Sequence, residues 1–394
     1  MLHLISLIGF VLNVHWAKLS GLPATDRDAE VDVDSDDEVD EPDSPTRSAN
    51  NGRGVADRFF VPQTESINSA IMTFLKARSG RTLPSAPAFN ALHSGTPTMI
   101  VDVHTHLPTH RDTVPDSDRT SEDMMRSGDE VSMTNSIADY LCAMEPVDKT
   151  FAFGIAPRPW GSEREIIDGS GDLTDGEKNH NDVAAELHKA APDKVIPFMS
   201  LHPMDPGMND EYDRAVGDLG CKGIKLGPNY QDFDPVGEAA FKLYARLEAD
   251  GLPIVFHQGT SPMRDAPLRY AQPLVMDQVA IAFPELRIVM AHLGHPWQND
   301  CMAVVRKHPN VWADVSAQFY RPWSFWNGMR VFHEWGATQK ILFASDWPVT
   351  VPQDNIDGLR NLSKFAKDHH LPGIPEDEIE GIINRDALDV LGVE

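Results

Sequence analysis

Residues 99–108 read MIVDVHTHLP, an apolar run that ends in two histidines one residue apart. Successive side chains on a β-strand point to opposite faces, so alternation predicts Asp102, His104 and His106 on one face and Val101, Val103 and Thr105 on the other. Two imidazoles on one face suit a metal ion. The pattern alone is weak evidence, because the chain holds 16 histidines in 394 residues. The sequence around it has to decide.

Seven more apolar runs follow, separated by segments with helical spacing of their apolar residues. The eight runs cover residues 99–106, 150–156, 195–202, 223–228, 253–259, 287–294, 310–319 and 340–348. Eight strand–helix units fit a closed barrel better than an open sheet, which usually has fewer strands. We therefore predict an α/β fold, a (β/α)8 TIM barrel, as a catalytic domain over residues 96–394.

Residues 1–95 are of a different kind and are predicted to form an N-terminal extension. Their apolar start resembles the core of a signal peptide but lacks a basic segment before it and a clear cleavage site. Residues 25–57 are dense in carboxylates, proline and glycine, which predicts a disordered acidic tail. Residues 66–79 have the spacing of a short helix.

Charge and cysteine usage limit the partners and the compartment. The formal net charge of −26 disfavours binding to nucleic acid or to anionic membrane surfaces. The three cysteines, Cys142, Cys221 and Cys301, lie far apart, which argues against a disulfide framework or a thiolate metal site. We expect a cytoplasmic homo-oligomer, with secretion as the less favoured alternative.

Polar residues stand where the predicted strands end, which is where barrel enzymes build their active sites. His104 and His106 end the first run, His257 the fifth, His292 the sixth and Asp346 the eighth. A lone buried histidine is more often a structural one, but this repeated placement favours a metal site. Imidazole and carboxylate ligands suit one catalytic divalent ion, with Zn²⁺ favoured over Mn²⁺, Fe²⁺ or Co²⁺.

Six motifs occur in the order expected of a known family: VDVHTH, GIKLGP, PIVFHQGTS, IVMAHLGHPW, ILFASDWP and NRDALDVLG. They resemble the amidohydrolase-related TIM-barrel hydrolases, including the branch of aminocarboxymuconate-semialdehyde decarboxylase. The resemblance implies that His104, His106, His257 and Asp346 hold the metal. It also implies that His292 is the catalytic acid/base, with His295 as a competing candidate.

Three cationic residues are candidates for substrate binding. The resemblance leaves two roles open for Lys225: a carbamylated bridge between two metals, or a partner for a substrate anion. The single histidine of the fifth run favours one metal and hence the second role. Arg158 and Arg264 could clamp a substrate carboxylate, although surface arginines more often pair with nearby acids.

These residues predict a metal-dependent hydrolase that acts on a small, anionic carbonyl compound, an amide, lactone or ester. A metal-activated water would attack the carbonyl, and His292 or Asp346 would take its proton. The alternative is a non-oxidative decarboxylase of an aromatic or muconate-like acid with the same metal site. An inactive barrel that serves as a scaffold is the third reading.

Overall fold

The described part of the chain comprises residues 99–108, 131, 135–160 and 179–394 of a computed structural model. All of these residues belong to one compact unit. The predicted N-terminal extension, residues 1–95, lies outside the described residues, so its acidic tail and short helix stay predictions. No helix in the described part is both long enough and apolar enough to span a membrane.

Eight strands occur in the described residues, and every pair of neighbours is parallel. They form two sheets, with the orders β1-β2-β3 and β4-β5-β6-β7-β8. The strands are β1 (Val101–His106), β2 (Lys149–Phe153), β3 (Val195–Pro197), β4 (Ile224–Leu226), β5 (Ile254–Phe256), β6 (Ile288–Met290), β7 (Val311–Asp314) and β8 (Ile341–Leu342).

Parallel bridges join the two sheets into a closed barrel. Met199, just beyond β3, bridges to Ile224, and its carbonyl accepts the N–H of Lys225 at 2.8 Å. On the other side Thr105 of β1 bridges to Trp347, and the N–H of His106 donates to the Trp347 carbonyl at 2.8 Å. The predicted (β/α)8 TIM barrel is therefore confirmed.

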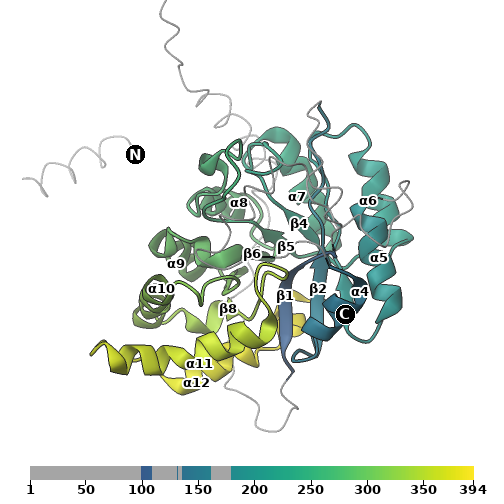
Figure 1. Ribbon diagram of the computed structural model, residues 1–394. Helices are drawn as coiled ribbons and strands as arrows, with labels where there is room; N and C mark the ends of the chain where they lie inside the picture. The colour runs from purple at the N-terminus through teal and green to yellow at the C-terminus, as the bar shows by residue number, and fades with distance from the viewer. Residues whose placement is uncertain (1–98, 109–130, 132–134, 161–178) are drawn as a thin grey trace, which may run out of the picture. The chain divides into compact units, whose positions relative to one another are not determined.

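Helices surround the strands (Figure 1). Side-chain caps explain where two of them begin: Ser136 and Asp139 form a capping box at α4, and Asn179 and Asp182 form one at α5. The helices are α4 (Ile137–Ala143), α5 (His180–Ala190), α6 (Met208–Gly217), α7 (Glu238–Asp250), α8 (Val275–Ala282), α9 (Gln298–Lys307), α10 (Pro322–Glu334), α11 (Pro352–Asp368), α12 (Glu376–Ile383) and α13 (Ala387–Leu391). Short 3-10 turns are η2 (Leu268–Tyr270), η3 (Ala291–Gly294) and η4 (Thr338–Lys340).

The apolar side chains form two cores, as expected of strands that are buried on both faces. One core joins alternate strand residues, such as Ile254 and Ile288, to the inner faces of the helices. The other fills the barrel itself and includes Val103, Phe151 and Trp312, together with residues of α13. The barrel is thus a packed body, and the space for chemistry is left to its ends.

A β-bulge in β1 changes the alternation that the sequence predicts. Asp102 pairs with Thr150 and Thr105 with Ala152, so two residues of β1 lie opposite one residue of β2. Val103 therefore belongs to the core inside the barrel, and His104, next to it, also turns toward the barrel axis. The expected separation of these two side chains onto opposite faces is wrong, because the bulge inserts one extra residue.

Candidate metal centre

Three of the predicted metal ligands converge at the mouth of the barrel. Asp346 Oδ1 lies 3.2 Å from His104 Nε2 and 3.2 Å from His106 Nε2. These three atoms form one of two groups in the described residues that could hold a metal ion. We call His104, His106 and Asp346 the His-His-Asp cluster.

The loops beyond the strands carry most of the polar groups at this mouth. The strands are shorter than the predicted runs, so His257 follows β5, His292 lies in η3 and Asp346 lies beyond β8. Two of these residues have left-handed backbones, with φ 58° at His292 and φ 67° at Asp346. Such a conformation costs a non-glycine residue about 1–2 kcal/mol. The hydrogen bond from the Asp346 N–H to the His104 carbonyl, 2.8 Å, helps to hold Asp346 in this conformation.

His257 and His292 lie beside the cluster and contact each other. His292 Nε2 is 3.3 Å from His257 Nδ1, and the other ring nitrogen of His257 is 3.2 Å from the Thr260 carbonyl. The His292 ring centroid is 4.9 Å from that of His104. The centroid of the Tyr230 ring lies 4.5 Å from that of His257. His257 thus contacts the cluster's neighbour His292 but is not a member of the His-His-Asp cluster.

Lys225 is buried at the centre of this arrangement. Its Nζ lies 2.8 Å from His104 Nε2 and 4.8 Å from the centre of the Phe153 ring. Burial lowers the pKa of Lys225 to about 8, while Asp346 and Asp314 oppose that shift. A neutral amine is therefore more accessible here than on a surface lysine, which is compatible with either role that the sequence left open.

Burial also keeps two of the histidines neutral. It lowers the pKa of His292 to about 4 and holds the pKa of His257 well below its usual range. Burial would raise the pKa of Asp346, but His292 and His104 outweigh it, so this pKa is well below the ordinary value. At neutral pH His257 and His292 are therefore neutral and Asp346 is ionised. The pKa of His104 is raised instead, because burial and Lys225, which lower it, are outweighed by the carboxylates of Asp314 and Asp346.

This donor set fits a divalent metal ion. Imidazole nitrogen and carboxylate oxygen are the usual ligands of catalytic zinc and related ions. The three ligand atoms of the His-His-Asp cluster lie within 4.8 Å of one another, as the ligands of a single ion do. The residues present could therefore hold one divalent ion, and the chemistry alone does not single out zinc.

The sequence did not single out Asp314 and Ser316, at and just beyond the end of β7. His104, His292 and Asp314 form the second group that could hold a metal ion. Asp314 Oδ2 lies 3.0 Å from His104 Nδ1, on the side of the ring away from the cluster. A signal was present, because Asp314 follows the apolar residues Val311–Ala313, but the predicted run extended past it to residue 319.

The other predicted residues lie farther out. Arg158 donates to the Tyr230 carbonyl at 3.0 Å and pairs with Asp265 at 3.2 Å. Arg264 is exposed. His295, the competitor of His292, contacts Gln298 instead of the cluster. A carboxylate clamp made by the two arginines stays a prediction.

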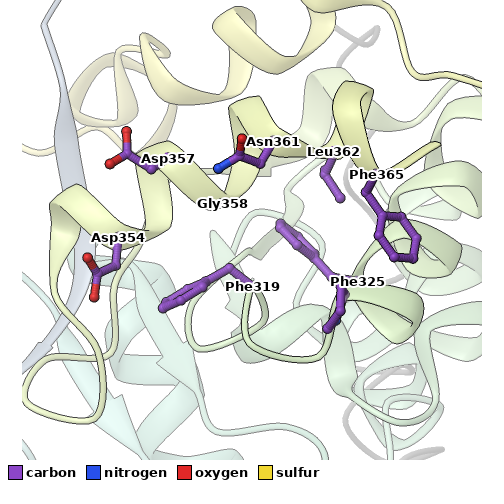
Figure 2. Close-up of a pocket in the computed structure, with 9 residues that line it drawn as sticks. Phe319, Phe325, Asp354, Asp357, Gly358, Asn361, Leu362 and Phe365 are labelled. Carbon is purple, nitrogen blue, oxygen red and sulfur yellow. The ribbon is translucent and has the colours of Figure 1, made fainter. Parts of the chain in front are cut away.

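A pocket of about 360 Å³ lies away from this centre, between α10 and α11 (Figure 2). Phe319 and Phe325 line it on one side, and Asp354, Asp357 and Asn361 of α11 on the other. None of the His-His-Asp cluster lines it. The pocket lies between two helices outside the barrel. It is therefore separate from the candidate metal centre at the ends of the strands.

A closed (β/α)8 barrel with a His-His-Asp group at its mouth belongs to the class of metal-binding barrel enzymes. The family model described as Amidohydrolase matches residues 101–393. The chain therefore belongs to the amidohydrolase family, as its motifs predicted.

Solved structures share this fold. An uncharacterised TIM-barrel protein from Bordetella bronchiseptica matches with 20% identity and a TM-score of 0.54, over 74% of this chain and 98% of its own. A 5-carboxyvanillate decarboxylase from Sphingomonas paucimobilis matches with 15% identity and a TM-score of 0.51, over 76% and 100%. A dihydroxybenzoic acid decarboxylase from Polaromonas, with bound manganese and an inhibitor, matches with 15% identity and a TM-score of 0.51, over 75% of this chain and 97% of its own. A comparison with curated proteins found no match.

Proposed function

We propose that this enzyme removes CO₂, without oxidation, from a small aromatic or unsaturated carboxylic acid. The observation that carries the proposal is the buried Lys225 beside the His-His-Asp cluster, 2.8 Å from His104. A buried ammonium attracts a substrate carboxylate, and Phe153 lines the same place. Two similar barrels are decarboxylases of aromatic acids, which reverses the order of the two activities that the sequence favoured.

His104, His106, His257 and Asp346 would hold one divalent ion, zinc or manganese. When bound, that ion supplies a Lewis acid for the oxygen atoms of the substrate. For His257, Nδ1 is the candidate ligand atom, because Nε2 lies against the Thr260 carbonyl. The manganese of the similar decarboxylase makes that metal as reasonable as zinc for this chain.

His292 would carry the proton. Its Nε2 faces His257, and its pKa of about 4 leaves the ring neutral, so that once it has taken a proton from the substrate or solvent it is a strong proton donor. The bond between the substrate carbon and its carboxylate then breaks, and the electron pair stays on that carbon. The carbon takes the proton from His292, and CO₂ leaves.

Hydrolysis of a small ester, lactone or amide is the second candidate. It is favoured by the position of Asp346, whose Oδ1 is held at the cluster and whose lowered pKa keeps the carboxylate ionised. Asp346 or His292 would take the proton of an attacking water. The same residues thus serve either reaction, and the substrate decides between them.

Substrate panels distinguish the two activities. The purified enzyme, supplied with Zn²⁺ or Mn²⁺, is incubated with 5-carboxyvanillate, a dihydroxybenzoate and a set of lactones and aryl esters. We expect CO₂ release from an aromatic acid, lost on chelation and lost in His292→Asn. The exposed His369 provides a matched control, since His369→Ala should keep full activity. Metal-dependent hydrolysis with no CO₂ from any acid would favour the second candidate.

A further inference from the structure

The Asp314 carboxylate connects two histidines of the candidate site. Its Oδ2 lies 3.0 Å from His104 Nδ1, and its Oδ1 accepts hydrogen bonds from the backbone N–H groups of His292, 2.9 Å, and Ser316, 3.0 Å. The Ser316 hydroxyl also donates to Oδ1. Asp314 and Ser316 are fully buried, so this network is shielded from solvent.

The directions of these hydrogen bonds follow from the groups themselves. An ionised carboxylate only accepts, so His104 must carry its proton on Nδ1, which leaves the Nε2 lone pair toward Asp346 and His106. The Ser316 hydroxyl uses its single proton on Asp314, so its oxygen must accept from His292 Nδ1, 2.8 Å away. Neutral His292 then has its lone pair on Nε2, where the proposed proton transfer occurs.

The same carboxylate supports an unfavourable backbone. His292 and Leu293 have φ 58° and φ 50°, a left-handed region that non-glycine residues avoid. The His292 N–H that this turn presents to the interior is accepted by Asp314. Asp314 thus acts on the direction of the His292 ring as well as on its proton.

The geometry points to Asp314 and Ser316 as positioning residues that fix the tautomers of the proposed metal ligand and of the proposed acid/base. Asp314 acts on His104 directly and on His292 through Ser316. The inference rests on the proposed function for the roles of the two histidines, but the hydrogen-bond pattern itself is independent of any substrate. The two branches are separable by mutation, because the Ser316 hydroxyl lies 2.8 Å from His292 Nδ1 but 3.3 Å from His104 Nδ1, which Asp314 holds at 3.0 Å.

The test measures two properties, the tautomers of the histidines and the affinity for Zn²⁺. A merely structural role would change both together. Nitrogen-15 spectra of the histidines, recorded on the metal-free protein at mildly alkaline pH, report the tautomer of each ring. Competition with a chromophoric chelator gives the affinity for Zn²⁺. Wild type should show His104 and His292 protonated on Nδ1.

The variants should differ in kind. Ser316→Ala should shift the tautomer of His292 only and leave Zn²⁺ affinity at the wild-type value, and Ser316→Thr should restore the tautomer. Asp314→Asn should disturb His104 and weaken Zn²⁺ binding about 10–100-fold, as for other partners of metal-binding histidines. Circular dichroism and thermal unfolding identify any variant that fails to fold. If Ser316→Ala fails to fold, the His292 tautomer of Ser316→Thr is compared with that of the wild type instead.

Several results would overturn the inference. A wild-type protein with either histidine protonated on Nε2 contradicts the assigned directions, and an unchanged His292 tautomer in Ser316→Ala contradicts the role of Ser316. Wild-type tautomers as assigned, together with no binding of Zn²⁺ or Mn²⁺, would instead refute the proposed metal site and leave the hydrogen-bond network standing.

Discussion

At the scale of single residues, the site is a collection of groups whose lone pairs are aimed at one place. His104 is the most constrained of them, because Asp314 contacts one nitrogen and Asp346, with Lys225, contacts the other. Its side chain is fully buried, so it has no room to turn away. Loss of the His104 ring should therefore weaken metal binding more than loss of a side chain outside the His-His-Asp cluster.

His104→Ala should remove metal binding. One ligand is lost, and the hydrogen bond that Asp314 makes is lost with it, so the affinity should fall by more than the about 10–100-fold typical of an outer partner. Metal content by elemental analysis after dialysis against dilute Zn²⁺ measures the effect. His369→Ala is the control and should keep the wild-type stoichiometry; retained metal in His104→Ala would rule out the proposed ligand set.

At the scale of elements, the loops beyond short strands place the side chains. The loop after β5 is tied to the loop after β6, since the Thr260 N–H donates to the His295 carbonyl at 2.8 Å. Gly259 makes this approach possible with φ 98°, and a Cβ there would lie 2.2 Å from that carbonyl oxygen. The position of His257 therefore depends on a glycine two residues away.

Gly259→Ala should destabilise the protein by about 2 kcal/mol or more, because the added methyl group meets backbone and the conformation is strained. Denaturant unfolding monitored by circular dichroism measures the loss. Gly381→Ala, inside α12, is the matched control: nothing lies within 4 Å of its Cβ position, and helix propensity predicts a gain of about 0.5–1 kcal/mol. Equal stabilities for the two variants would contradict the close approach.

At the scale of the whole molecule, closing the barrel brings distant segments together. His104 and Asp314 are 210 positions apart in the chain and only 3.0 Å apart in space. A metal ion bound by such groups stabilises the native barrel alone, since the unfolded chain scatters its ligands. Metal binding should therefore be visible as stability of the entire fold.

Adding Zn²⁺ to the metal-free protein should raise its Tm. At a free concentration about 100 times the Kd, mass action contributes about 2.7 kcal/mol. Differential scanning calorimetry with and without excess chelator measures the shift, which His104→Ala should abolish. A Tm that is independent of Zn²⁺ and Mn²⁺ in the wild-type protein would contradict a metal site in the folded barrel.

The sequence by itself determined the number and order of the strands and the polar residues that follow them. Local rules suffice for this, because burial on both faces selects short apolar runs and the ends of strands are where polar groups are tolerated. The family followed from the same motifs and is confirmed by the match over residues 101–393.

Only the tertiary structure decided which of those polar groups meet. The bulge that turns His104 inward, the partnership of Arg158 with Asp265 and the network of Asp314 and Ser316 all depend on contacts between distant strands and loops. No local pattern encodes such distances, because they are fixed only when the barrel closes and neighbouring loops take up their final packing.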